Sequence, residues 1–155
     1  MTKNEIKKAI ENAVKFYDVI NENFYEERDL ALKKEFGESY GYTENEDTYE
    51  KFYTIDGVTY ENNEEIAKAV FGIKTSDDYN LLLKELTEDA ITDVEEGEVT
   101  TSDPLSLLLG FLVGEENGGV VIEKKNGEIE ITPDGFSCYS PSYNVEEFLK
   151  AYSKK

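Results

Sequence analysis

The spacing of apolar residues along the first 36 positions is typical of a helix with one buried face. Thr2 and Glu5 have the spacing of a capping box, and Gly37 is a stop signal behind the segment. We therefore predict one long N-terminal helix over residues 1–36. Its apolar face consists of Ile6, Ala9, Ile10, Ala13, Tyr17, Ile20 and Phe24.

A tight β-hairpin is predicted within residues 49–62. The Asp56-Gly57 pair is typical of a two-residue type I′ turn, and alternating apolar residues flank it. The turn fixes the register, so that four side chains share one face, which we expect to pack against a helix. These side chains form the pairs Ile55 with Val58 and Tyr53 with Tyr60.

Two helices are predicted after this hairpin. The first runs from Glu64 to Phe71 and ends at Gly72. The second runs from Asp77 to about Glu96, where apolar residues recur at helical spacing. Its buried stripe consists of Tyr79, Leu82, Leu83, Leu86, Ala90 and Val94.

The segment 104–113 is apolar on nearly all sides, which predicts the central helix of the core. A partner-binding apolar helix is the alternative. Asp103 is expected as the N-cap, with Pro104 at the first helical position and Gly114 behind the helix. The apolar residues are Leu105, Leu107, Leu108, Leu109, Phe111, Leu112 and Val113.

A second hairpin is predicted around the turn Asn126-Gly127. Residues 136–140 resemble a third strand, which would extend this hairpin to an antiparallel meander, and Asn144 is expected to cap a final helix. The inner face of the hairpin pairs Lys124 with Ile129 and Ile122 with Ile131, and the final helix turns Phe148, Leu149 and Tyr152 inward. The predicted fold class is α+β, with about five helices and two hairpin-based groups of strands.

Negative charge is concentrated in the middle of the chain. The 155 residues contain 35 Asp and Glu against 16 Lys and Arg, a net charge of −19. Residues 37–103 hold 19 acidic and 4 basic residues, whereas residues 1–36 and 104–155 are nearly balanced, at net −1 and −3. We expect one acidic domain over residues 1–155, in which this uneven charge favours a basic partner.

One face of the predicted helix 77–96 carries acidic residues, and no Lys or Arg occurs between Glu85 and Glu123. Like charges one turn apart, such as Glu85 and Asp89, destabilise a helix by a few tenths of a kcal/mol each, on the order of 0.2–0.5. Their presence suggests either that the charges have little effect or that the face binds a basic partner. The candidate partner-binding residues here are Glu85, Glu88, Asp89, Asp93, Glu95 and Glu96.

A second candidate surface is the acidic segment that precedes the first hairpin. It contains no base between Glu35 and Glu50, and tyrosines alternate there with carboxylates. Ordinary packing of a loop or an edge is one interpretation. The other is a contact surface, because tyrosine stacks on guanidinium groups and carboxylates attract basic side chains. The candidate residues are Tyr40, Tyr42, Tyr49, Glu44, Glu46, Asp47 and Glu50.

Several kinds of chemistry lack their residues in this sequence. Histidine is absent, Cys138 is the single cysteine, and no phosphate-binding glycine loop or nucleophile elbow occurs. We expect no catalytic residues, no cofactor and no built metal site, although a weak divalent-cation site in residues 89–98 stays open. The longest apolar segment, residues 105–113, is about half of the roughly 20 residues of a membrane span, so we expect a cytoplasmic protein.

The expected partner is a protein with a basic groove, such as a nucleic-acid-binding enzyme. Direct binding to nucleic acid or to an anionic membrane would begin from charge repulsion. Carboxylates one helical turn apart lie about 5–6 Å from one another, close to the roughly 7 Å between successive phosphates. An acidic helix face can therefore occupy a site built for a nucleic-acid backbone.

In its small size, its acidic surface with tyrosines and its lack of catalytic groups, the chain resembles phage-encoded anti-CRISPR proteins and DNA-mimic antirestriction proteins. This resemblance implies an inhibitor of a nuclease. Residues 73–83 are also similar to an early helix of a family of toxin-immunity domains, with Thr75 or Ser76 in place of a proline of that pattern. An immunity protein, and an acidic structural domain whose charge only maintains solubility, are therefore the two alternatives.

Overall fold

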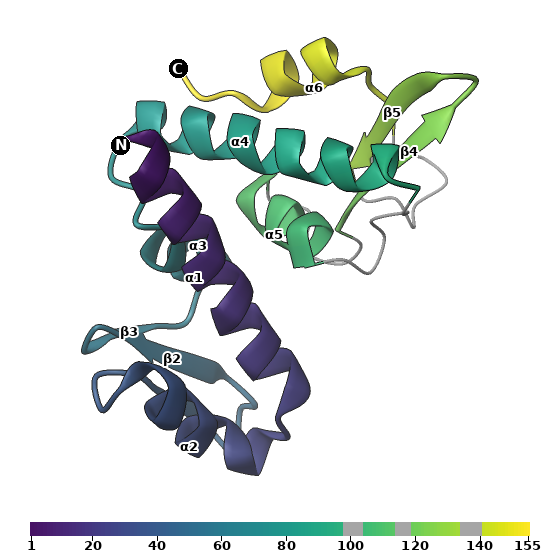
Figure 1. Cartoon of the computed structure of the whole chain (residues 1–155). Coiled ribbons are helices and arrows are strands. Elements are labelled where there is room, and N and C mark those ends of the chain that lie inside the picture. The colour runs from purple at the N-terminus through teal and green to yellow at the C-terminus, as the bar shows by residue number, and fades with distance from the viewer. Residues whose placement is uncertain (98–103, 114–118, 134–140) are drawn as a thin grey trace.

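The computed structural model describes residues 1–97, 104–113, 119–133 and 141–155. These residues form six α-helices, a three-stranded antiparallel sheet and a two-stranded hairpin (Figure 1), so that the predicted α+β class is confirmed. In the part of the chain that is described, no helix is both long and apolar enough to cross a membrane.

The N-terminal segment forms two helices rather than one, α1 (Lys3–Glu22) and α2 (Tyr25–Phe36). Half of the predicted capping box is present, because the Thr2 hydroxyl accepts from the Glu5 amide over 3.2 Å. The Glu5 carboxylate accepts from the Thr2 hydroxyl, over 3.1 Å, and not from the Thr2 amide. The prediction of one helix over residues 1–36 is wrong at Asn23 and Phe24, which both have extended backbone. The Asn23 side chain donates back to the Val19 carbonyl and so ends α1. Phe24, assigned to the apolar face, is 77% exposed.

The first sheet contains β1 (Gly41–Glu44), β2 (Lys51–Ile55) and β3 (Val58–Tyr60), in the order β1-β2-β3. The hairpin at the Asp56-Gly57 turn and its register are confirmed, and both turn residues have positive φ. Strand β1 was not predicted, because its residues belong to the acidic segment. The expectation that all four paired side chains pack inward is wrong for Val58, which is exposed on the three-residue edge strand.

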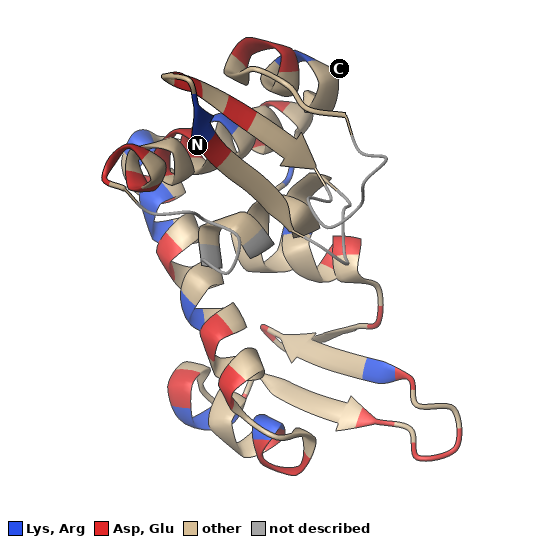
Figure 2. Cartoon of the chain, turned by 90° about the vertical axis from the view of Figure 1, so that its right-hand side faces the viewer, with Lys and Arg blue, Asp and Glu red and all other residues tan. Residues whose placement is uncertain are grey.

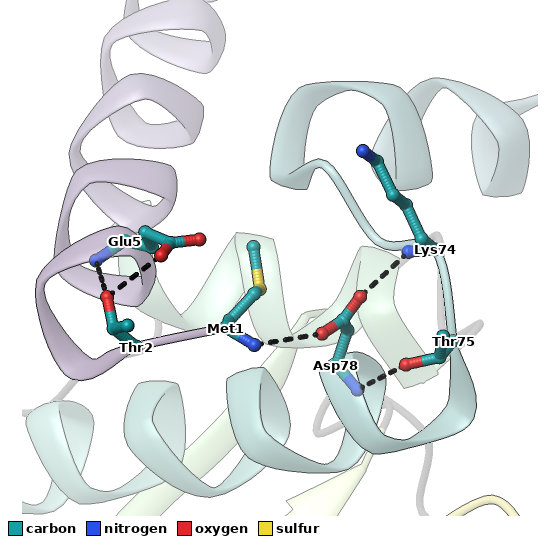
Figure 3. A network of polar contacts seen from close by, with 6 residues as sticks. All are labelled: Met1, Thr2, Glu5, Lys74, Thr75 and Asp78. Atoms are coloured by element: carbon teal, nitrogen blue, oxygen red, sulfur yellow. Dashed lines mark hydrogen bonds and ion pairs between the residues drawn. The ribbon is translucent and has the colours of Figure 1, made fainter.

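Helices α3 (Asn63–Phe71) and α4 (Ser76–Glu95) follow as predicted, with Gly72 in the left-handed conformation behind α3. All six residues of the predicted α4 stripe are buried. The N-terminus of α4 is built from polar contacts (Figure 3). The Thr75 hydroxyl accepts from the Asp78 amide, and the Asp78 carboxylate accepts from the Lys74 amide and pairs with the Met1 amino group.

Helix α5 (Pro104–Val113) is the central core helix, as predicted. It contacts α1, α3, α4 and the strand β4, and Leu108 and Leu109 are fully buried. The Tyr79 hydroxyl of α4 donates to the Leu112 carbonyl at the end of α5 over 3.0 Å. The predicted cap Asp103 and the stop Gly114 lie outside the described residues.

The second hairpin consists of β4 (Val120–Lys125) and β5 (Glu128–Pro133), joined by the predicted Asn126-Gly127 turn. Its register is confirmed, with Ile122 opposite Ile131 and Lys124 opposite Ile129. Helix α6 (Val145–Tyr152) begins at its predicted cap, Asn144, and Phe148 is buried. The predicted strand 136–140, with Cys138, lies outside the described residues.

Helix α1 joins the two ends of the molecule (Figure 1). Its N-terminal half lies near α4 and α3, and its C-terminal half reaches α2 and the sheet β1-β2-β3. Buried side chains from both ends belong to one hydrophobic cluster. The candidate surfaces are therefore positioned by a continuous core.

Candidate functional site

The two acidic segments singled out in the sequence do not form one surface. In Figure 2 the C-terminal end of α4 lies at the upper left, whereas the loop between β1 and β2 projects at the lower right. We call the first group the α4 acidic face and the second the β1-β2 acidic loop. The α4 acidic face comprises Glu85, Glu88, Asp89, Asp93, Glu95 and Glu96, and the β1-β2 acidic loop comprises residues 44–50.

The α4 acidic face occupies the C-terminal half of its helix. Glu88, Glu95 and Glu96 are exposed there, whereas Asp93 is half-buried, because it follows Ala90 of the buried stripe by one helical turn. No basic residue lies in the last turn of α4, where Glu95 and Glu96 stand. The carbonyl end of a helix carries a partial negative charge equivalent to about half an elementary charge. The carboxylates of Glu95 and Glu96 therefore add to the negative potential at this end of α4. No basic residue in the last turn offsets it.

Neighbouring charges act on Asp89 in particular. Desolvation raises the pKa of the Asp89 carboxyl, and Glu85 and Glu88 raise it further, whereas Lys7 of α1 lowers it. A cation from another helix thus acts on this face, although no Lys or Arg occurs in the sequence between Glu85 and Glu123. Lys7 is nevertheless not within ion-pair distance of Asp89.

Three carboxylates of the α4 acidic face have no counter-ion. Glu88, Glu95 and Glu96 are exposed, and no Lys or Arg nitrogen among the described residues lies within 4.0 Å of them. This statement covers the whole chain, because all 16 basic residues fall within the described ranges. Charges left unpaired on an ordered helix are available to a partner.

The β1-β2 acidic loop is held by its own hydrogen bonds. The Asn45 side chain accepts from the amides of Asp47 and Thr48, at 2.9 and 3.2 Å. The Tyr49 amide donates to the Asn45 carbonyl, and the Asn45 amide donates to the Glu50 carbonyl. The loop thus presents its side chains from a defined turn.

The three candidate tyrosines have different environments. Tyr40 stacks on Phe36 with ring centroids 4.9 Å apart, and Tyr42 is 6% exposed between Tyr25 and Tyr53. These two are packing residues. Tyr49 is 76% exposed on the loop and makes no ring contact with the described residues.

An open pocket of about 450 Å³ lies between α2 and β1. We call it the tyrosine pocket. It brings four of the predicted residues, Tyr42, Tyr49, Glu44 and Glu46, together with residues of α2 that sequence analysis missed. Its lining residues are Tyr25, Glu26, Asp29, Tyr42, Thr43, Glu44, Glu46 and Tyr49.

The chain's own cations already contact the rings of this pocket. The Arg28 guanidinium carbon lies 4.8 Å from the Tyr25 ring centre and 5.2 Å from that of Tyr42, and the Lys51 ammonium lies 4.4 Å from that of Tyr25. Lys51 also donates a hydrogen bond to the Tyr25 hydroxyl, and this bond lowers the pKa of that phenol. Cations therefore bind these rings in the absence of any partner.

The pocket carboxylates differ in how far they are neutralised. Asp29 pairs with Lys33 over 2.8 Å and accepts from the Tyr42 amide, and both contacts hold the pKa of the Asp29 carboxyl below its usual range. Glu44 accepts a hydrogen bond from the Tyr42 hydroxyl, whose pKa is raised to about 12, chiefly by burial. Glu26 and Glu46 have no cation within ion-pair distance among the described residues.

The sequence contained one signal for the missed part of the pocket. Asn23 is a helix-stop residue, and Tyr25 and Arg28 follow it in the only stretch of the chain that contains arginine. The prediction of one continuous helix left both residues outside the predicted apolar face. Among the described residues, no three acidic or thiol groups converge in a geometry that could hold a metal ion. What the two surfaces offer chemically is attraction of cations.

Comparisons of this chain with protein-family models, with curated proteins and with solved structures find no match.

Proposed function

We propose that the chain is a non-catalytic inhibitor that binds the basic nucleic-acid-binding surface of a protein such as a CRISPR effector or another nuclease. The observation that carries this proposal is the α4 acidic face, on which Glu88, Glu95 and Glu96 are exposed without a counter-ion. A basic protein surface would supply the missing charge, whereas nucleic acid and anionic membranes would add to the repulsion.

The geometry of α4 supports imitation of a nucleic-acid backbone. Carboxylates one turn apart on a helix repeat at about 5–6 Å, and a groove built for phosphates offers cations at a spacing close to this. The buried stripe anchors α4 on the core, so its acidic face is presented by a rigid element. A rigid charged face keeps the entropy cost of binding low. The target enzymes act on intracellular nucleic acid, which fits the expected cytoplasmic location.

The experiment compares two triple variants that change the net charge equally. The test variant is Glu88→Gln, Glu95→Gln, Glu96→Gln, and the control changes three exposed glutamates elsewhere, Glu11→Gln, Glu22→Gln, Glu61→Gln. Calorimetry measures binding to a panel of purified RNA-guided and restriction nucleases, and a cleavage assay measures inhibition.

At least one nuclease is expected to bind the wild-type chain and to be inhibited. The test variant should weaken that complex about tenfold or more, which corresponds to about 1.4 kcal/mol, and the control should weaken it far less. Equal weakening by both variants would show that only net charge matters. If no nuclease binds, but a toxin encoded beside the chain is neutralised, the immunity interpretation replaces this one.

A further inference from the structure

We propose that the tyrosine pocket receives one arginine side chain of the basic partner. This inference rests on the proposed function and adds a second, specific contact to it, at the end of the molecule away from the α4 acidic face (Figure 2). The occupant follows from three features of the pocket, which are its hollow shape, its exposed rings and its excess of carboxylates.

The pocket is large enough to receive one long side chain. Its volume of about 450 Å³ is near the lower end of the range for ligand sites, roughly 300–1,000 Å³. Helix α2 forms one wall through Tyr25, Glu26 and Asp29, and β1 with its loop forms the other. The Asp29 carboxylate accepts from the Tyr42 amide over 2.8 Å and joins the two walls, so the hollow is built into the fold.

Two aromatic rings of the pocket keep much of their surface exposed to solvent. Tyr25 is 49% exposed although Arg28 and Lys51 contact its ring, and Tyr49 is 76% exposed with no ring contact among the described residues. Exposed aromatic rings that line a hollow are typical of protein-binding surfaces. The contacts made by Arg28 and Lys51 identify the kind of group that these rings accept, which is a cation.

The negative charges near the pocket outnumber the positive ones, so a further cation would be attracted. Four carboxylates line the pocket, from Glu26, Asp29, Glu44 and Glu46, and the loop adds Asp47 and Glu50. The cations nearby are Lys33, which pairs with Asp29, and the stacked pair Arg28 and Lys51. The four lining carboxylates and the two on the loop thus outnumber the three cations. A phosphate group would meet net repulsion here, so the charge balance disfavours direct nucleic-acid binding at this end as well.

Arginine matches these features better than lysine does. A guanidinium group is planar, so it stacks on a tyrosine ring while its edge donates hydrogen bonds to carboxylates. Glu44 and Glu46 both line the pocket and offer such acceptors. An ammonium group is more strongly hydrated and lacks the flat surface. Arginine is also the basic residue that most often contacts phosphates and bases. The nucleic-acid-binding surface of a target protein therefore contains arginine side chains that could enter the pocket.

The test uses a labelled peptide of alternating arginine and glycine, with a lysine-glycine peptide of equal charge beside it. Fluorescence anisotropy measures the affinity of both. Tyr49→Ala leaves the net charge unchanged, and Phe24→Ala is its control, because Phe24 is equally exposed but lies outside the pocket. Glu44→Gln with Glu46→Gln is compared with Glu95→Gln with Glu96→Gln, which removes the same charge from the α4 acidic face. Circular dichroism checks that each variant is folded.

The wild-type chain should prefer the arginine peptide. Tyr49→Ala should weaken that affinity about two- to fivefold, and Tyr49→Phe, which keeps the ring, should restore it. Phe24→Ala should have no effect, and the Glu44, Glu46 pair should matter more than the Glu95, Glu96 pair. Equal binding of both peptides, or no effect of Tyr49→Ala, would overturn the proposal.

The same variants separate this inference from the proposed function. If the pocket variants bind both the peptide and a target nuclease like the wild-type chain, while the α4 triple variant loses the nuclease, the arginine site is refuted and the inhibitor function stands. If the pocket variants lose the arginine peptide but no nuclease binds the wild-type chain, the pocket stands and the function is refuted.

Discussion

The Nη1 atom of Arg28 donates a hydrogen bond to the hydroxyl of Tyr53 over 2.9 Å. This bond joins α2 to β2, the middle strand of the first sheet. The Nη2 atom donates to the Asn23 carbonyl, at the point where α1 ends. The only arginine of the chain therefore connects the turn between α1 and α2 to the first sheet.

We expect Arg28→Lys to destabilise the protein by about 1–2 kcal/mol. Lysine keeps the charge but loses the fork that reaches Tyr53 and Asn23 together, and it stacks less well on Tyr25 and Tyr42. Urea denaturation measures the change in free energy of unfolding. The control Lys34→Arg alters an exposed side chain and should stay within about 0.5 kcal/mol. A wild-type midpoint for Arg28→Lys would refute a structural role for the fork.

Asp29→Asn should lower stability more at neutral pH than in acid. The pKa of Asp29 is lower in the folded protein, first because Lys33 donates to it and then because the Tyr42 amide does. Its stabilising effect is therefore complete above the unfolded value of about 3.9, and it disappears as the pH falls through the lower folded value. The side chain is about a third exposed, so the loss at pH 7 should be only about 0.5–1 kcal/mol.

Urea denaturation of Asp29→Asn and the wild-type chain at pH 7 and pH 3 measures this difference. The gap between the two proteins should narrow at pH 3. A gap that stays constant with pH would mean that the side chain acts through its shape and hydrogen bonds alone.

Two buried tyrosines should respond in opposite ways to loss of the hydroxyl. The Tyr17 hydroxyl is buried with no hydrogen-bond partner among the described residues, and burial raises the pKa of this phenol. The Tyr79 hydroxyl donates to the Leu112 carbonyl. Tyr17→Phe should leave stability unchanged or raise it by up to about 1 kcal/mol, whereas Tyr79→Phe should lower it by about 1–2 kcal/mol. Thermal unfolding of the pair measures both, and a loss on Tyr17→Phe would show that its hydroxyl has a partner.

Salt should weaken the proposed complex strongly. Screening shortens the range of electrostatic attraction from about 10 Å at 0.1 M to about 3 Å at 1 M ionic strength. We expect calorimetry to show a loss in affinity of about tenfold or more over that range. The α4 triple variant should show a shallower dependence than the triple control, because fewer charge pairs form. Salt-independent binding would indicate an apolar interface instead.

Local signals in the sequence predicted much of the fold. The Asp56-Gly57 and Asn126-Gly127 turns fixed two registers correctly, because a two-residue turn permits few alternatives. The stripe of α4 was also correct, since a 20-residue helix averages over many positions. The break at Asn23 was missed because asparagine is a weaker stop signal than glycine or proline. The bonds of Arg28 to Asn23 and to Tyr53 stabilise the turn.

The candidate site was only partly accessible from the sequence. Acidic residues without nearby bases were visible along α4 and the loop. The tyrosine pocket was not, because Tyr25 and Asp29 meet Tyr42 only when α2 folds back on β1. Strand β1 itself escaped prediction. Tyr42 and Thr43 favour a strand, but the flanking Gly41 and Glu44 do not, and all four residues belong to the acidic segment. Lys7 reaches α4 from another helix, which no linear charge count reveals.

Helix α1 connects the two regions of the molecule that carry the proposed contacts. Its 20 residues span about 30 Å, and it packs against elements at both ends of the molecule, so it cannot bend without opening the core. Under our proposals, the α4 acidic face and the tyrosine pocket are two contact points on one rigid molecule. A partner whose basic surface extends far enough gains both contacts at once, and their affinities then multiply through effective concentration. A smaller basic protein would reach only one of the two surfaces. Their separation would therefore favour targets of sufficient size as well as of basic charge.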